Sequence, residues 1–195
     1  MKFSVLAGRV KQLLARSADV SDDELIATFN AANNYLFNEI VALQPQFYTT
    51  VIPVQIGAHI DGSPVVSDYG TVLAIPDDCN RVLDVLDSKL VSVFDADCRY
   101  PGLWQGYLLL NGVNLATNQS YYLSYVPDCT QVEKLDQDSP YDAVGNEFLV
   151  YYCVWFIKNA AGVDATDAIF KQSLERVKRE ICKFARGRKS VRGYL

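Results

Sequence analysis

Residues 147–162 read EFLVYYCVWFIKNAAG, and this stretch decides the fold. It is almost wholly apolar and aromatic up to Lys158, which predicts a deeply buried helix with other elements packed around it. Gly162 stands where the C-terminus of a helix needs a residue that tolerates a positive φ. The acidic, polar residues 128–146 before it predict a connector.

A second, amphipathic helix is expected after Gly162. Asp164 and Asp167 can cap its start. Its apolar stripe consists of Phe170, Leu174, Val177, Ile181 and Phe184, and its other faces carry Lys171, Lys178, Arg179, Lys183 and Arg186. Residues 187–195 read GRKSVRGYL, with two glycines and no periodicity. They predict a flexible tail that becomes ordered only on a partner.

Two helices are expected at the N-terminus. The first covers about residues 2–16. The second starts after Ser21, because Ser21 and Glu24 have the spacing of a capping box. Its apolar residues recur at steps of three and four until Pro45 ends the helix, and they are Leu25, Phe29, Ala32, Leu36, Ile40 and Leu43.

Residues 47–127 predict an antiparallel sheet of some five to seven strands. The β-rich runs are FYTTVIPVQI, TVLAIP, RVLDVLD, KLVSVFD, GYLLLNG and SYYLSYVP. Asp61-Gly62 and Asn111-Gly112 suit hairpin corners, and we expect GYLLL to pair with VNLAT around the second of them.

The expected fold is therefore α+β, in which N-terminal and C-terminal helices form a bundle and a central segment forms an antiparallel β-sheet. The expected segments are residues 1–44 (N-terminal helices), 45–140 (β-rich), 141–186 (C-terminal helices completing the bundle) and 187–195 (flexible basic tail). The length of 195 residues suits one compact domain, or one domain with an extended element.

The charge is distributed unevenly. From Lys171 to Leu195 there are nine Lys or Arg and two acids, a formal charge of +7, whereas the rest of the chain carries −12. This asymmetry is compatible with a solvated helix face, and it also suits contact with an acidic surface, either another protein or nucleic acid.

Residues for catalysis or metal binding are not grouped in any known pattern. The single histidine, His59, has no nucleophile motif near it, and phosphate loops and zinc or calcium motifs are absent. Asp77 with Asp78, Asp95 with Asp97, and Asp136 with Asp138 resemble turn acids more than ion ligands. We expect neither an enzyme nor a cofactor.

The cysteines and the N-terminus favour a cytosolic product. The five cysteines lack metal-binding spacing and are expected to be reduced, buried hydrophobes. Arg9, Lys11 and Arg16 interrupt the apolar start of the chain, so a signal peptide or a membrane span is not expected.

The aromatic residues allow more than one interpretation. Tyr121, Tyr122, Tyr125, Tyr151 and Tyr152 are concentrated in two elements. They could stack on bases, but no basic residue lies among them, so sheet packing and subunit contacts are the favoured roles.

The order of these elements resembles the head-to-tail adaptor proteins of tailed bacteriophages, the tail tubular protein A-like group. The residues that carry the resemblance are residues 73–82, LAIPDDCNRV, followed by the aromatic helix, the AGVD turn and the basic last helix. The β-rich segment is larger than in the smallest, all-helical adaptors.

The resemblance implies a structural virion protein, made in the host cytoplasm, at the head-tail junction. Such adaptors form a homo-oligomeric ring, usually twelvefold, between the portal protein and a tail (nozzle or tube) protein, and DNA passes through it without specific binding. They dock on the portal through their C-terminal segment. In this sequence the docking residues would be Lys183, Arg186, Arg188, Lys189, Arg192, Tyr194 and Leu195.

Other functions fit the same features. Another virion or assembly protein, or a nucleic-acid-binding protein, could use the basic C-terminus, although the pI of about 4.9 weighs against nucleic acid. A virion module that binds carbohydrate or a receptor would instead use an exposed aromatic groove.

Overall fold

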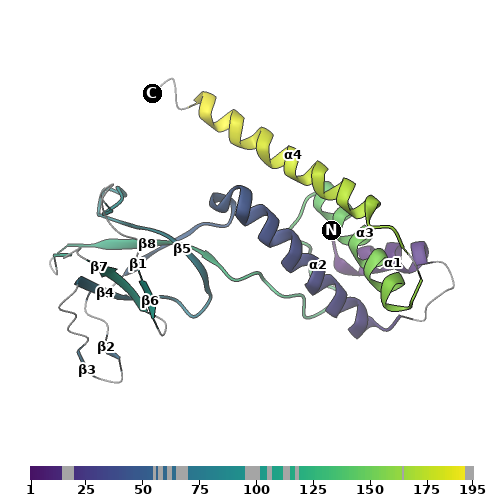
Figure 1. The fold of residues 1–195 in the computed structure, drawn as a ribbon, viewed down its shortest axis with the longest axis horizontal. Helices are drawn as coiled ribbons and strands as arrows, with labels where there is room; N and C mark the ends of the chain where they lie inside the picture. Colours follow the sequence, from purple (N-terminus) through teal and green to yellow (C-terminus); the bar gives the residue numbers. More distant parts are fainter. Residues whose placement is uncertain are drawn as a thin grey trace. The chain divides into compact units, whose positions relative to one another are not determined.

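The computed structural model describes residues 1–14, 20–54, 56, 59–60, 63–64, 70–94, 102–104, 107–111, 115–116, 119–163 and 165–191. Within them the chain forms two compact units, which we call the helical unit (Met1–Gln44 with Cys129–Leu195) and the β unit (Pro45–Asp128) (Figure 1). The protein is therefore α+β, as predicted. Residues 129–140, expected in the β-rich segment, belong to the helical unit.

The helical unit contains α1 (Phe3–Leu14), α2 (Asp22–Leu43), α3 (Ala143–Ala160) and α4 (Ala168–Val191). The apolar helix α3 packs against each of the other three. All four helices supply core side chains, among them Phe3, Leu6, Leu25, Phe29, Leu36, Phe148, Leu149, Cys153, Phe170 and Leu174. The N-terminal and C-terminal helices thus share one hydrophobic core.

Helix α2 forms as its sequence predicts. The Oγ of Ser21 accepts a hydrogen bond from the Glu24 amide at 3.2 Å, which satisfies one of the first amides of the helix. The expected stripe is buried from Leu25 to Ile40, whereas its last residue, Leu43, is 40% exposed. The helix ends at Leu43, before Pro45.

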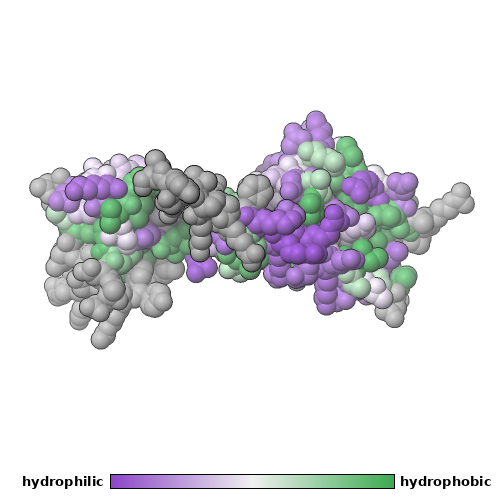
Figure 2. Space-filling view, turned by 90° about the horizontal axis from the view of Figure 1, so that it is seen from above, coloured by the Kyte–Doolittle hydropathy of each residue, from purple (hydrophilic) through white to green (hydrophobic). Residues whose placement is uncertain are grey.

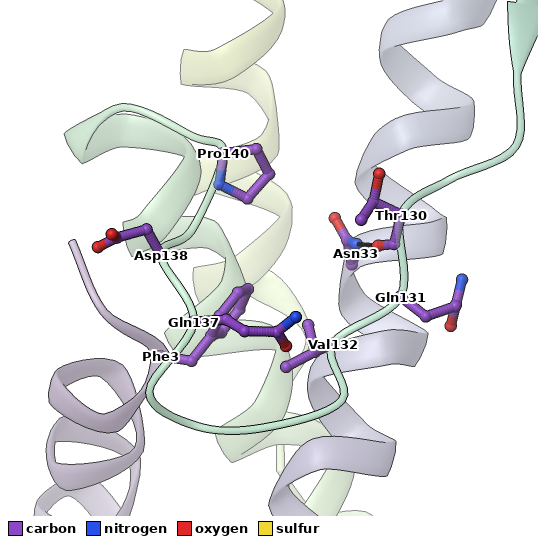
Figure 3. Close-up of a pocket in the computed structure, with 8 residues that line it drawn as sticks. All are labelled: Phe3, Asn33, Thr130, Gln131, Val132, Gln137, Asp138 and Pro140. Carbon is purple, nitrogen blue, oxygen red and sulfur yellow. Dashed lines mark hydrogen bonds between the residues drawn. The ribbon is translucent and has the colours of Figure 1, made fainter.

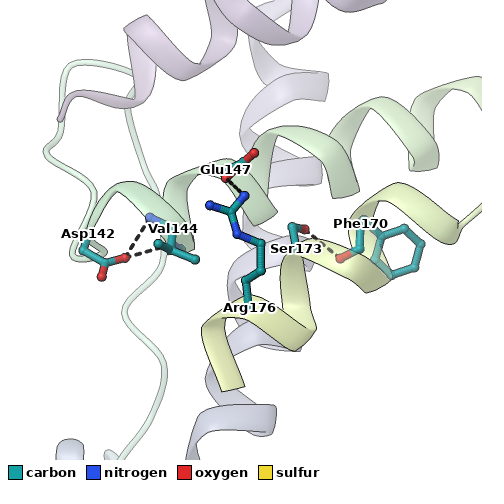
Figure 4. Close-up of polar contacts among 7 residues, drawn as sticks. Asp142, Val144, Glu147, Phe170, Ser173 and Arg176 are labelled. Atoms are coloured by element: carbon teal, nitrogen blue, oxygen red, sulfur yellow. Dashed lines mark hydrogen bonds and ion pairs between the residues drawn. The ribbon is translucent and has the colours of Figure 1, made fainter. Parts of the chain in front are cut away.

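Helix α3 differs from the prediction in two ways. It starts at Ala143, because the Asp142 carboxylate accepts from the amides of Val144 at 3.0 Å and Gly145 at 2.9 Å and so caps the helix inside the expected connector (Figure 4). It is also buried on one side only. Phe148 is fully buried, but Phe156 is 42% exposed.

Helix α4 extends further than predicted. The sequence pattern places the end of the helix at Arg186, but the structure continues it to Val191. The expectation of a flexible tail from residue 187 is therefore wrong for residues 187–191. A single Gly187 costs a helix only about 1 kcal/mol relative to Ala, and the neighbouring Arg188 and Lys189 are good helix formers.

The connector before α3 is fixed to α2 by two asparagines. Asn30 mimics a backbone strand: its Nδ2 donates to the Val132 carbonyl at 3.0 Å, and its Oδ1 accepts from the Val132 amide at 2.7 Å. Asn33 donates to the Thr130 carbonyl at 2.7 Å and accepts from the Tyr141 hydroxyl at 2.5 Å. These bonds place residues 129–142 in the helical unit.

The β unit begins with the short 3-10 helix η1 (Pro45–Phe47) and contains two three-stranded antiparallel sheets among its described residues. In the first, β8 (Tyr121–Pro127) lies between β1 (Thr50–Val54) and β5 (Cys79–Leu86); in the second, β7 (Tyr107–Asn111) lies between β4 (Gly70–Ala74) and β6 (Gly102–Trp104). A bridge between Ile56 and Leu73 links the two sheets. Their common core contains Leu73, Val85, Leu108, Leu110, Tyr121, Leu123 and Tyr125.

The predicted hairpins have different outcomes. Strands β2 (His59–Ile60) and β3 (Ser63–Pro64) pair on either side of Asp61-Gly62, which themselves lie outside the described residues. The pairing of GYLLL with VNLAT is wrong, because β4 and β6 occupy both edges of β7.

The run KLVSVFD does not form the expected strand. The Asp87 carboxylate accepts from the amides of Lys89 and Val91, both within 2.9 Å, and closes a turn at the start of this run. Within the run only Ser92 forms a bridge, to Leu86.

Candidate interaction surface

The outer side of α4 carries a line of basic residues, Arg176, Arg179, Lys183 and Arg186, which we call the basic stripe. Steps of three and four residues place them on one face of the helix. The buried residues Phe170, Leu174, Val177 and Ile181 form the opposite face. Viewed from the side of α4, the helical unit shows a broad band of hydrophilic residues (Figure 2).

The first part of the basic stripe borders a cleft beside the start of α3. The cleft has a volume of about 170 Å³ and is lined by Val144, Arg176, Arg179, Glu180 and Lys183. Three of these five side chains are cationic and one is anionic. The cleft is therefore suited to a ligand that carries more than one negative charge.

The cationic side chains along this cleft differ in whether they form ion pairs. Arg176 donates to the Glu147 carboxylate of α3 at 2.7 Å (Figure 4), and Lys183 donates to Glu180 at 2.7 Å. Arg179 is exposed, and its Nε donates to the main-chain carbonyl of Glu175 at 3.1 Å. Among the ion pairs of the described residues, Arg179 has no carboxylate partner.

Two other lysines of α4 have structural roles. Lys178 binds Glu39 of α2 at 2.8 Å and reaches Glu175 at 3.6 Å, and its side chain is only 27% exposed. The hydrogen bond that Lys178 donates to the Glu39 carboxylate is the main cause that raises the pKa of Lys178. Lys171 pairs with Asp167 at the start of the helix. Both lysines hold α4 in place.

The expected docking residues lie at the far end of α4. Lys183 is 70% exposed. Arg186, Arg188 and Lys189 stand on helical backbone, and their side chains are outside the described part, as are Arg192, Tyr194 and Leu195 entirely. In Figure 1 the last turns of α4 extend beyond α3, past the end at which α3 starts.

Sequence reasoning missed the contribution of Arg176 and Arg179 to an interaction surface. Both are included in the charge asymmetry, but neither is in the expected docking set. Their spacing to Lys183 is the signal that could have identified them. The cleft itself could not be foreseen, because it depends on how the start of α3 packs beside α4.

A second cleft lies between α2, the start of α1 and the connector. It is lined by Phe3, Asn33, Thr130, Gln131, Val132, Gln137, Asp138 and Pro140 (Figure 3). Asn33, its most buried polar residue, already uses both ends of its amide for the connector. The most buried polar side chain of this cleft is therefore already satisfied within the protein.

The remaining candidates add no chemistry within the described residues. The side chain of His59 and the pair Asp95 and Asp97 lie outside that part. No group of three or more His, Cys, Asp or Glu there could hold a metal ion, and no helix there has the length and apolarity of a membrane span. Cys153 is fully buried, and burial raises the pKa of its thiol.

Comparison with known proteins gives no further assignment, since neither a protein-family model nor a curated protein matches the chain.

Proposed function

We propose that this protein is a structural virion protein that serves as a head-to-tail adaptor, forming a homo-oligomeric ring between the portal protein and a tail protein. The observation that carries the proposal is the charge pattern at the end of α4. No acidic residue follows Glu180, whereas Lys183, Arg186, Arg188, Lys189 and Arg192 do. The proposal also draws on the resemblance in element order described above.

The basic residues beyond Lys183 need a partner outside their own helix. A cation in a helix is commonly satisfied by an acid three or four residues away. Arg186, Arg188 and Lys189 have no acid at those distances, while the more N-terminal Lys171 and Lys178 do pair with acids. An acidic groove on the portal would supply the missing counter-charges through charge-assisted hydrogen bonds.

Docking then involves a helix that already exists, up to Val191. Beyond this helix, Tyr194 and Leu195 would fill apolar pockets on the portal. A ring of identical subunits makes this docking multivalent, because each bound C-terminus raises the effective concentration of the next.

Co-sedimentation with portal rings from the same virus tests the proposal. The full-length protein is expected to bind the portal ring at a fixed stoichiometry, close to one adaptor per portal subunit. A protein truncated after Arg186 and the triple variant Arg186→Glu, Arg188→Glu, Lys189→Glu should both fail to bind. A variant with Lys2, Lys89 and Lys134 changed to Glu is the control, since it alters the net charge equally and should still bind.

Two results would contradict the adaptor role. Portal binding that persists in the triple variant would show that the end of α4 is not the docking segment. Absence of portal binding, together with salt-sensitive binding of duplex DNA by the full-length protein, would favour the nucleic-acid alternative.

A further inference from the structure

The middle of α4 offers a cationic site that shares only Lys183 with the proposed portal contact. Arg179 lines the cleft between Arg176 and Lys183 and is exposed. Its Nε is bound to a main-chain carbonyl, which leaves the two terminal nitrogens of the guanidinium for another acceptor. An Arg flanked by two further cations is suited to a pair or cluster of carboxylates.

The β unit carries charge of the opposite sign. Over residues 45–128 there are nine Asp, no Glu and three Lys or Arg, a formal charge of −6; α4 carries eight Lys or Arg and two Glu, a formal charge of +6. The two values are equal and opposite.

Three exposed aspartates of the β unit form what we call the acidic face: Asp77, Asp78 and Asp128. The Asp128 amide donates to the Asp78 carbonyl at 2.6 Å, so these two residues are adjacent. Burial, and then the charges of Asp78 and Asp128, raise the pKa of the neighbouring Cys79. Asp78 and Asp128 therefore both lie close to Cys79, and Asp77 precedes Asp78 in the chain, so the three aspartates form one negatively charged patch.

The acidic face has only neutral partners among the described residues. Asn80 donates to Asp128 at 3.2 Å, and the Tyr125 hydroxyl donates to Asp78 at 3.2 Å. Described ion pairs do not include any of the three aspartates. A cation from another molecule would therefore meet carboxylates that no described ion pair neutralises.

We propose that the cleft around Arg179 binds the acidic face of a second copy of this chain. The contact joins two different surfaces, so after binding one copy keeps its acidic face open and the other keeps its cleft open. Such heterologous contacts produce a ring where the rotation closes and a filament where it does not. This inference does not rest on the portal contact, because it involves α4 before residue 186 and needs only the protein itself.

A protein partner fits this cleft better than DNA. Glu147 and Glu180 occupy two of its three cations, and their carboxylates would repel a run of phosphates. The β unit carries a formal charge of −6, equal in size to the +6 of α4, so a second copy of the chain offers a partner of moderate negative charge.

Mixing two variants tests the contact. Arg179→Glu destroys the cationic surface and keeps the acidic face, whereas the double variant Asp77→Lys, Asp128→Lys does the reverse. By sedimentation velocity at low salt, the wild type should form oligomers that dissociate at high salt, and each variant alone should remain monomeric. An equimolar mixture has one intact contact and should give a 1:1 dimer that does not grow.

The outcomes separate this contact from its alternatives. Lys134→Glu, the control, should assemble as the wild type does, whereas Arg179→Glu should weaken association by about tenfold or more. Far-UV circular dichroism shows whether each variant is folded, and Arg179→Lys, which keeps the charge, should retain most of the association.

A monomeric wild type at low salt, or a mixture that remains monomeric while both variants are folded, would overturn the proposal. A second result would also overturn it. If the wild type retards a short DNA duplex in a gel and Arg179→Glu does not, while both oligomerise equally, the cleft belongs to nucleic acid. Each of these results leaves portal binding by the end of α4 unaffected, so failure of one proposal can be told from failure of the other.

Discussion

At the scale of single residues, Leu90 is the clearest departure from ordinary backbone geometry. Its φ is +60°, and its side chain is 60% exposed. The turn that holds it is fixed by Asp87, whose carboxylate accepts from the Lys89 and Val91 amides and whose amide donates to the Val91 carbonyl at 2.8 Å. Local hydrogen bonds therefore impose a left-handed conformation on a residue that disfavours it.

Replacing this leucine should stabilise the protein. Leu90→Gly removes the steric cost of the positive φ and loses little buried surface, so we expect unfolding to cost about 0.5–1 kcal/mol more than in the wild type. Leu90→Ala is the matched control, because it keeps the Cβ and its strain. Urea unfolding monitored by circular dichroism measures both. Equal stability of the Gly and Ala variants would show that the turn is not strained.

At the scale of elements, Lys178 joins α4 to α2 through Glu39. The pair is about one-third exposed, so Glu39→Gln should lower the free energy of unfolding by only about 0.5–1 kcal/mol. Glu175→Gln, the control, removes the longer contact of 3.6 Å to a well-exposed carboxylate and should cost less. Thermal unfolding at neutral pH compares the two variants.

The same pair predicts a dependence on pH. The pKa of Lys178 is raised in the folded protein, chiefly by Glu39, so the charged lysine is favoured on folding. Its contribution is complete at neutral pH and is lost as the pH rises through the raised pKa. The difference between the wild type and Glu39→Gln should therefore shrink in alkaline solution. A difference that stays constant with pH would mean that the amide disturbs packing and not charge.

Local signals predicted the helices better than the sheet. The cap at Ser21, the stripe that includes Leu25 and Phe29, and the positive φ of Gly162 (+73°) are all confirmed, because each depends on residues within one or two turns. The partners of β7 are β4 and β6, of which β4 lies more than thirty residues away in the chain. The Asn111-Gly112 dipeptide next to β7 therefore does not indicate which strands pair with it.

The candidate surface was likewise only partly predictable from the sequence. The excess of positive charge after Lys171 is plain in the sequence. The sequence does not show which of those cations already form ion pairs, since Arg176 and Lys178 pair with Glu147 and Glu39 on other helices. Only the packed structure identifies Arg179 as the cation of the cleft without a carboxylate partner among the described ion pairs.

At the scale of the whole molecule, the β unit is one continuous insertion between the last residues of α2 and the connector that leads to α3. Its strands pair only with one another among the described residues, and its core cluster contains no residue from outside it. The helical unit likewise keeps its own core, built from all four helices. A unit that satisfies its own backbone and buries its own apolar surface can fold alone.

Residues 45–128 expressed by themselves are therefore expected to form a folded β domain, although one of this size should be only marginally stable. Its circular dichroism should be that of a β protein, and it should unfold cooperatively in urea. The control is a fragment of residues 45–120, which lacks β8 and so removes the strand that pairs with both β1 and β5. That fragment should be unfolded.

If residues 45–128 are also unfolded, the sheet depends on the helical unit, and effects of Asp77→Lys on assembly would have to be measured against the stability of the whole chain. If they fold, the acidic face can be presented to α4 of the intact protein as a separate domain, and the contact proposed for Arg179 can be measured between two soluble species.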